Sequence, residues 1–302
     1  MKPSYLELFA SGELAERVRL AHERLAGCSL CPRACGANRL AGERGSCHSG
    51  ENAVVCSFHA HHGEETPLSG ERGSGAIFFT WCSLRCQFCQ NYEISQLGEG
   101  QEVDSEDLAV MMLSLQRAGC HNVNLVTPSH VVPQILSALE IAATHGLHLP
   151  LVYNSSGYDS VETLKLLDGI VDIYMPDMKY GDAEVGLRLS GIRDYPAINQ
   201  AAVREMHRQV GDLAVDERGI AARGLLVRHL VLPNGLAGTA EVVRMLAEDV
   251  SRSTYINVMD QYRPCYQAQA HPEINRPITR QEYEEAVDMA LAHGLTRLDM
   301  QR

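Results

Sequence analysis

The stretch Trp81-Cys82-Ser83-Leu84-Arg85-Cys86-Gln87-Phe88-Cys89-Gln90 decides how this 302-residue chain is interpreted. Its three cysteines follow the apolar run 76–80 at the spacing C-x3-C-x2-C. A loop this short can turn three thiolates toward one point, whereas structural zinc sites and ferredoxin-type clusters usually take four protein ligands. Three thiolates therefore predict a metal centre with one position open to another molecule. The alternative, ordinary buried cysteines, would leave the spacing to chance.

Composition and charge narrow the class of protein. The formal net charge of −12 argues against general binding to nucleic acid. No apolar run approaches the roughly 20 residues of a membrane span, and residues 1–7 turn acidic before a signal peptide could form. Ten cysteines in such a chain indicate a reducing compartment, where thiols bind metal or do chemistry. We therefore expect a cytoplasmic metalloprotein with no membrane and no nucleic-acid partner.

A second group of cysteines precedes this stretch. Cys28, Cys31, Cys35 and Cys47 lie within twenty residues, and the first two form a C-x2-C pair. This spacing predicts a second metal site, either structural zinc or an iron–sulfur cluster, with Cys56 as a possible replacement for Cys47. Four unpaired structural thiols are the alternative.

Residues 57–66 contain a cluster of potential metal ligands: His59, His61, His62, Glu64 and Glu65. Such side chains can hold a metal, but their irregular spacing is more typical of a solvated loop.

From residue 76 onward, short apolar runs alternate with helical patterns. We expect strands at 76–80, 122–127, 149–153, 170–175, 224–232 and 254–259. We expect helices at 105–118, 131–145, 159–168, 197–210, 239–250 and 280–293, and another at 13–26. This alternation predicts an α/β fold, a partial parallel barrel of about six strands. Residues 1–70 would form an N-terminal helix and cysteine-rich segment, and 71–302 the barrel.

Polar residues follow each expected strand. They include Thr127, Ser129 and His130 after the second, Ser156 after the third, and Asp177 and Lys179 after the fourth. Arg228 interrupts the fifth, and Gln261 follows the sixth. Because the carboxyl ends of barrel strands form the active-site face, these residues should surround whatever the three-cysteine loop holds.

Taken together, these residues resemble the radical S-adenosylmethionine superfamily. The resemblance rests on Cys82-x3-Cys86-x2-Cys89 at the end of the first barrel strand, with Phe88 before the last cysteine. Within that superfamily the chain is similar to the pyruvate formate-lyase activating enzyme branch, particularly to relatives with an N-terminal cysteine-rich segment. Supporting matches are Asn91–Ser95, Met175–Lys179, Arg228–Pro233 and Met259–Pro264.

The resemblance implies a [4Fe-4S] cluster bound by Cys82, Cys86 and Cys89, whose open iron chelates the amino and carboxylate groups of S-adenosylmethionine. It implies that the backbone at Phe88 contacts the adenine and that Asp177 and Lys179 hold the methionine end. Ser156, Arg228 and Gln261 would line the ribose and substrate side. The Gly-Gly-Glu-Pro-like motif of the family is replaced by Thr127-Pro128-Ser129-His130, so Thr127, Ser129 or His130 would contact the methionyl amino group instead.

The resemblance also implies a function. A 5′-deoxyadenosyl radical would abstract a hydrogen atom from a substrate, which would be a glycine of a partner glycyl-radical enzyme, a small molecule or another peptide. A flavodoxin- or ferredoxin-type protein would supply the electron. The alternatives from other classes are a non-catalytic iron–sulfur electron carrier and a zinc-stapled binding protein.

Overall fold

A computed structural model describes residues 2–299 of the chain. Its centre is a nine-stranded sheet in which six strands run parallel, in the order β2-β4-β5-β6-β8-β9. The six are β2 (Ser74–Phe79), β4 (Val123–Val126), β5 (Leu151–Ser155), β6 (Ile173–Pro176), β8 (Ala221–Leu230) and β9 (Tyr255–Met259). Each overlaps a strand expected from the sequence, so the α/β partial-barrel prediction is confirmed.

Three further strands extend the sheet. β1 (Ala53–His61) pairs antiparallel with β2, β3 (Gln101–Val103) pairs antiparallel with the start of β1, and β7 (Ala214–Val215) forms a hairpin with β8. The strand β1 corrects the expectation of a solvated loop at 57–66, because His59 and His61 lie in a paired strand and Glu64 and Glu65 are packed against the barrel. The division at residue 70 stays a prediction, although β1 joins the barrel sheet from the N-terminal side of that boundary.

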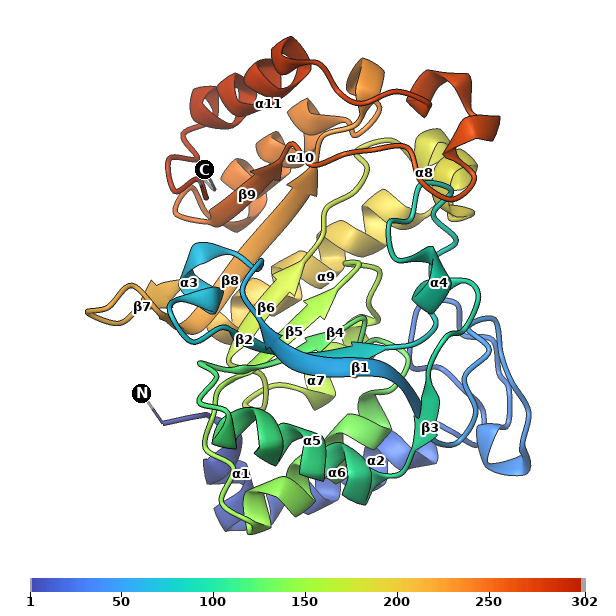
Figure 1. Cartoon of the computed structure of the whole chain (residues 1–302), viewed down its shortest axis with the longest axis vertical. Helices are drawn as coiled ribbons and strands as arrows, with labels where there is room; N and C mark the ends of the chain where they lie inside the picture. The colour runs from blue at the N-terminus through green and yellow to red at the C-terminus, as the bar shows by residue number, and fades with distance from the viewer. Residues whose placement is uncertain (1, 300–302) are drawn as a thin grey trace.

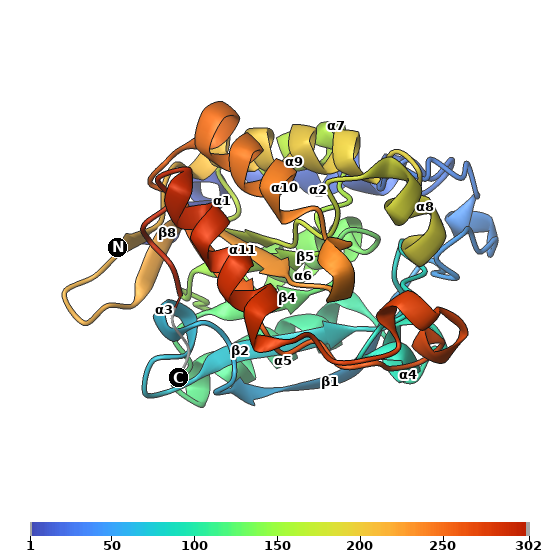
Figure 2. The ribbon, with the colours of Figure 1, turned by 90° about the horizontal axis from the view of Figure 1, so that it is seen from above.

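Helices cover the outer face of the sheet. Those joining the parallel strands are α5 (Ser105–Arg117), α6 (Val132–Thr144), α7 (Val161–Leu166), α8 (Ala183–Ser190), α9 (Tyr195–Val210) and α10 (Thr239–Met245), which continues as a π-helical turn to Val250. In Figure 2, α7, α9 and α10 lie along one side of the strands and β1 along the opposite side. The final helix, α11 (Arg280–Ala292), begins with the expected capping box of Thr279 and Glu282.

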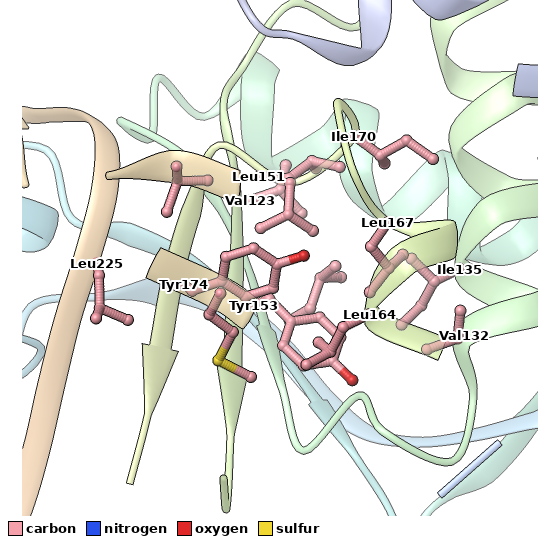
Figure 3. Close-up of a cluster of buried hydrophobic side chains, with 14 of the residues drawn as sticks. Val123, Val132, Ile135, Leu151, Tyr153, Leu164, Leu167, Ile170, Tyr174 and Leu225 are labelled. Atoms are coloured by element: carbon pink, nitrogen blue, oxygen red, sulfur yellow. The ribbon is translucent and has the colours of Figure 1, made fainter. Parts of the chain in front are cut away.

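The main core lies between the strands and these helices. Figure 3 shows Tyr153 and Tyr174 of β5 and β6 packed toward Ile135 of α6 and Leu164 of α7. Because side chains alternate across a strand, the neighbouring residues Asn154 and Met175 face the barrel interior instead. The sequence of each strand therefore divides its residues between the packed core and the functional side.

The N-terminal segment also packs on this scaffold. The helices α1 (Tyr5–Ser11) and α2 (Glu13–Glu23) bury Tyr5, Leu14 and Ala21 in the main core. Residues 24–52 follow as loops, with one 3-10 turn at Arg39–Ala41. Figures 1 and 2 show these loops at the end of the barrel that also carries α8 and α4 (Tyr92–Ser95). Short helical segments, α3 (Thr66–Ser69) and the 3-10 turns at 233–235, 268–270 and 272–274, complete the fold. Within residues 2–299, no helix is long and apolar enough to cross a membrane.

Candidate active site

The three-cysteine loop leaves β2 at its carboxyl end and is held by backbone hydrogen bonds to distant segments. Arg85 N donates to Ser190 O (3.2 Å) and Gln87 N donates to Leu189 O (2.8 Å), both at the end of α8. On the other side, Gln267 N donates to Gln87 O (2.9 Å). The loop is therefore fixed between α8 and the segment after β9, and its shape does not depend on its own sequence alone.

The three thiols of this loop lie close enough to influence one another. Burial, followed by the neighbouring Cys86 and Cys89, raises the pKa of Cys82 to about 12. Burial also raises the pKa of Cys86, while the charge of Lys179 acts in the opposite direction. Neighbouring thiolates repel each other, and a metal ligand must be a thiolate. A cationic metal centre bound to all three would remove this conflict.

A network of charged side chains lies beside the thiols at the ends of β6 and β8. Asp177 Oδ2 accepts from Lys179 Nζ at 2.5 Å, and its Oδ1 accepts from Arg228 Nε at 2.9 Å. Arg228 Nη2 also donates to Asn154 Oδ1 (2.7 Å). Burial acts to raise the pKa of Asp177, but Arg228 and Lys179 hold it below its ordinary value. Burial opposes the charge of Lys179, yet Asp177 and Cys86 raise the pKa of this ammonium to about 12. Both groups are therefore ionised near neutral pH.

Two consecutive glutamates, in the segment between β1 and α3, lie beside this network of charged side chains. Glu64 Oε2 lies 3.7 Å from Arg228 Nη1, and Glu65 Oε1 accepts from Asn257 Nδ2 at 2.9 Å. Burial raises the pKa of Glu64 to about 7, although the charge of Arg228 acts to lower it. Glu64 is thus placed to change its charge near neutral pH inside the barrel.

These groups surround a cavity of about 260 Å³ at the carboxyl end of the strands. Its lining combines two of the three cysteines with the charged network and with the segments after the cysteine loop and β9: Cys86, Phe88, Cys89, Gln90, Asn91, Asp177, Lys179, Arg228, Leu230, Met259 and Gln261. Phe88 packs edge-to-face against Tyr262, with ring centroids 5.7 Å apart. Gln261 O accepts from Gln90 Nε2 (3.1 Å), which joins two sides of the cavity.

The other polar residues predicted at the strand ends do not line this cavity. Ser129 Oγ donates to the buried carboxylate of Asp159 at 2.5 Å, and His130 Nε2 donates to Thr80 O at 2.9 Å. Thr127 adopts a left-handed backbone conformation with φ 63°, and the Ser156 carbonyl accepts from a tyrosine hydroxyl. None of these four predicted residues lines the cavity described above. Their proposed contacts with S-adenosylmethionine stay predictions.

The four N-terminal cysteines are brought together by the loops of residues 28–47. Burial raises the pKa of the Cys31 thiol to about 12, and Cys47, Cys28 and Cys35 lie close enough for their charges to act in the same direction. As the side chains stand, no group of three or more His, Cys, Asp or Glu within residues 2–299 has the geometry to hold a single metal ion.

Sequence reasoning missed two participants in the site. Ser190, the last residue of α8, donates from its Oγ to Cys86 Sγ at 2.9 Å. No local signal marks a serine 104 residues from its partner. The contact of Glu64 with Arg228 was also missed. The only signal in the sequence is that Glu64 and Glu65 are two adjacent acidic residues just before the first barrel strand.

Comparisons with known proteins agree with this geometry. The sequence profile of the radical S-adenosylmethionine superfamily matches residues 76–215. An uncharacterized protein of Methanocaldococcus jannaschii is 32% identical to the chain, and the aligned region covers 98% of this chain and 81% of that protein. The chain belongs to the radical S-adenosylmethionine superfamily.

Two solved structures are also similar. A radical S-adenosylmethionine methyltransferase from Sphaerobacter thermophilus superposes with a TM-score of 0.52 at 16% identity, over 73% of this chain and 64% of that one. SuiB of Streptococcus suis, bound to precursor peptide SuiA, gives a TM-score of 0.48 at 12% identity, over 70% and 44%. The chain spans less than two thirds of either protein. The first likeness supports the fold, and the second is too weak to support any argument.

Membership of this superfamily implies a [4Fe-4S] cluster, S-adenosylmethionine and radical chemistry between them. The described residues fit such a cluster, because Cys86 and Cys89 line a cavity that also contains a cationic and an anionic side chain. The third cysteine, Cys82, lies close enough to both for their charges to act on the pKa of its thiol. Membership implies neither the substrate nor the activation of a glycyl-radical enzyme.

Proposed function

We infer that Cys82, Cys86 and Cys89 bind a [4Fe-4S] cluster and that the adjoining cavity binds S-adenosylmethionine. When bound, the cluster supplies the electron that cleaves S-adenosylmethionine, giving a 5′-deoxyadenosyl radical that takes a hydrogen atom from the substrate. The observation that carries this proposal is the convergence of Cys86 and Cys89 of the cysteine loop, Asp177 and Lys179 after β6, and Arg228 of β8 on one cavity.

The charged network supplies binding groups for a zwitterionic ligand. Lys179 is cationic near neutral pH and presents a point charge suited to a carboxylate, and Asp177 is anionic and suited to an ammonium or hydroxyl group. Arg228 bonds to Asp177 and Asn154 and so keeps this carboxylate in place when Lys179 turns toward a ligand. These groups hold and orient the ligand, which lowers the entropic cost of reaction.

The aromatic side chains around the loop exclude water. Phe88, Tyr180, Tyr195 and Tyr262 are all buried and belong to one cluster with Leu84 and Cys86. A radical that attacks neighbouring C–H bonds needs an ordered and closed site. These packed aromatic side chains form one wall of that site.

The proposal also includes the electron donor and the substrate. A flavodoxin- or ferredoxin-type protein is the proposed donor, and the substrate is a glycine of a partner enzyme, a small molecule or another peptide. A non-catalytic electron carrier is less well supported, because it would not need the polar cavity beside the thiols.

Anaerobic assay of the reconstituted and reduced protein tests the proposal. We expect 5′-deoxyadenosine to form from S-adenosylmethionine, and we expect Cys86→Ala to abolish its formation. The control is Cys56→Ala, which changes an exposed cysteine outside the three-cysteine loop and outside the group Cys28, Cys31, Cys35 and Cys47, and which should leave product formation unchanged. Product formed equally by Cys86→Ala, or no product from a protein with an intact cluster and a competent reductant, would contradict the proposal.

A further inference from the structure

Residues 24–52 have almost no regular secondary structure and only a small hydrophobic cluster of their own. They contain one 3-10 turn, and their own buried cluster consists of Leu25, Cys28 and Leu30. Loops of this length without secondary structure are uncommon in compact domains, and small segments without a core usually rely on disulfides or metal. Three of the seven buried residues of this segment are cysteines: Cys28, Cys31 and Cys47 are each less than 8% exposed.

The backbone around these thiols is held in costly conformations. Ala34 has φ 38° and His48 has φ 60°, and each directly adjoins a cysteine of the group. Non-glycine residues adopt such angles at a cost of about 1–2 kcal/mol each, and they persist only where the surroundings impose them. Gly45 has a related role, because a Cβ at this position would lie 2.3 Å from Cys35 Sγ. Gly45 therefore leaves room for the sulfur of Cys35, which is the exposed member of the four cysteines.

A buried cation without an anionic partner lies beside the thiols. Arg39 is 1% exposed, and its two hydrogen bonds go to neutral carbonyls, Gly50 O at 2.6 Å and His130 O at 2.7 Å. Its Nη2 has no hydrogen-bond partner in the part of the chain that the structure describes, and the guanidinium interacts electrostatically with Cys28. A buried charge is costly unless it is paired, so this arrangement lacks a negative group.

We propose that Cys28, Cys31, Cys35 and Cys47 bind a structural zinc ion, and that Arg39 is the counter-charge of the resulting site. Four thiolates around Zn²⁺ carry a net charge of −2, which supplies the missing partner for the guanidinium. Zinc fits better than a cubane cluster, because thiolates on one tetrahedral ion lie closer together than thiolates on four separate iron atoms. Backbone hydrogen bonds from Cys28 N to Ala37 O (3.0 Å) and from Gly36 N to Cys28 O (3.0 Å) hold Cys28 against the residues that follow Cys35. The side chains of residues 2–299 do not by themselves form a metal-binding group of three or more ligands, so binding requires the thiols to rotate toward one point.

The zinc site would brace the three-cysteine loop. Arg33, between Cys31 and Cys35, donates from Nε to Ser83 O at 2.9 Å, and Arg85 Nη2 donates back to Ser46 O at 2.5 Å. The rings of His48 and Trp81 lie 4.9 Å apart. Each of these contacts joins a residue within two positions of an N-terminal cysteine to a residue of the three-cysteine loop.

Metal analysis of full-length protein carrying Cys82→Ala, Cys86→Ala and Cys89→Ala tests the site without the radical centre. We expect about one zinc per chain, with four sulfur neighbours at about 2.3 Å in zinc X-ray absorption. Adding Cys31→Ser should remove the zinc, and adding Cys56→Ser should not. Absence of zinc, a nitrogen- or oxygen-rich first shell, or an iron–sulfur cluster at these thiols after anaerobic purification would overturn the assignment. Because this background lacks the radical-site cysteines, its outcome is independent of the proposed function.

The role of Arg39 is tested by charge in the same background. We expect Arg39→Met to lose zinc to a competing chelator at about tenfold lower chelator concentration, and Arg39→Lys to remain close to the parent. If Arg39→Met and Arg39→Lys retained zinc equally well, the proposed role of Arg39 as counter-charge would be overturned. Circular dichroism of both variants shows whether the fold is kept. If the Met variant does not fold, the sulfur count around zinc in the parent still decides whether the site exists.

Discussion

Asp177 is the residue on which the charged network depends. Its carboxylate is buried between Lys179 and Arg228 and is hydrogen-bonded to both. Removing one partner of a buried ionic group leaves the others uncompensated, which typically costs about 3–5 kcal/mol.

We therefore predict that Asp177→Asn lowers the free energy of unfolding by about 3–5 kcal/mol. The matched control is Asp168→Asn, because Asp168 pairs with Arg208 at an exposed position and should lose less than about 1 kcal/mol. Urea unfolding of both variants measures the difference. Equal losses would show that the network contributes little to the fold.

Glu64 gives the fold a pH dependence of known sign. Its pKa rises from 4.5 to about 7 on folding, mainly through burial, so the folded state binds more protons than the unfolded state between these values. The stability contributed by this group is full below pH 4.5 and is lost as the pH rises through about 7.

We predict that Glu64→Gln reduces the fall in unfolding free energy between pH 5 and pH 8 by about 2 kcal/mol. Denaturant titrations at the two pH values measure the effect, with the exposed Glu106→Gln as control. A pH profile unchanged by Glu64→Gln would mean that Glu64 titrates normally in the folded protein.

At the scale of elements, the cysteine loop depends on α8. The end of this helix supplies two backbone acceptors to the loop and the Ser190 hydroxyl that bonds to Cys86 Sγ. Hydrogen bonds to cluster sulfurs stabilise the reduced, more negative state and so raise the reduction potential.

We predict that Ser190→Ala makes the potential of the reconstituted cluster more negative by roughly 40 mV, the equivalent of one hydrogen bond of about 1 kcal/mol. Potentiometric titration followed by electron paramagnetic resonance measures this shift. Ser11→Ala, at an exposed position in α1, should leave it unchanged. A potential unaffected by Ser190→Ala would remove the helix from this role.

The sequence predicts the elements of the barrel well because buried parallel strands have a simple signature. Apolar runs such as Ile173–Pro176 are surrounded on both faces, so their composition alone indicates a strand. β1 was missed because it lies toward the edge of the sheet and mixes buried and exposed residues. Contacts such as Ser190 with Cys86 and Glu64 with Arg228 join residues more than 100 positions apart, and no local pattern can indicate them.

At the scale of the whole molecule, the N-terminal segment and the barrel are joined in several places. Tyr5 is fully buried and donates from its hydroxyl to Leu149 O at 3.2 Å, and β1 pairs with β2 over six positions. From these contacts we expect the segments on the two sides of residue 70 to unfold as one cooperative unit.

We predict that Tyr5→Ala lowers the stability of the entire chain by about 3–5 kcal/mol while leaving a single unfolding transition. Coincident unfolding curves from circular dichroism and tyrosine fluorescence measure this, and Glu7→Ala on the exposed side of α1 is the control. Two separate transitions would show that the N-terminal segment unfolds independently.

The central claim is that three thiolates hold a cluster with one iron open to S-adenosylmethionine. Electron–nuclear double resonance of the reduced cluster, with S-adenosylmethionine labelled at the amino nitrogen and carboxylate oxygen, tests it most directly. The account predicts that both labels couple magnetically to the cluster and that the signal is lost in Cys86→Ala. A four-ligand cluster whose spectrum shows no coupling to either label would contradict it.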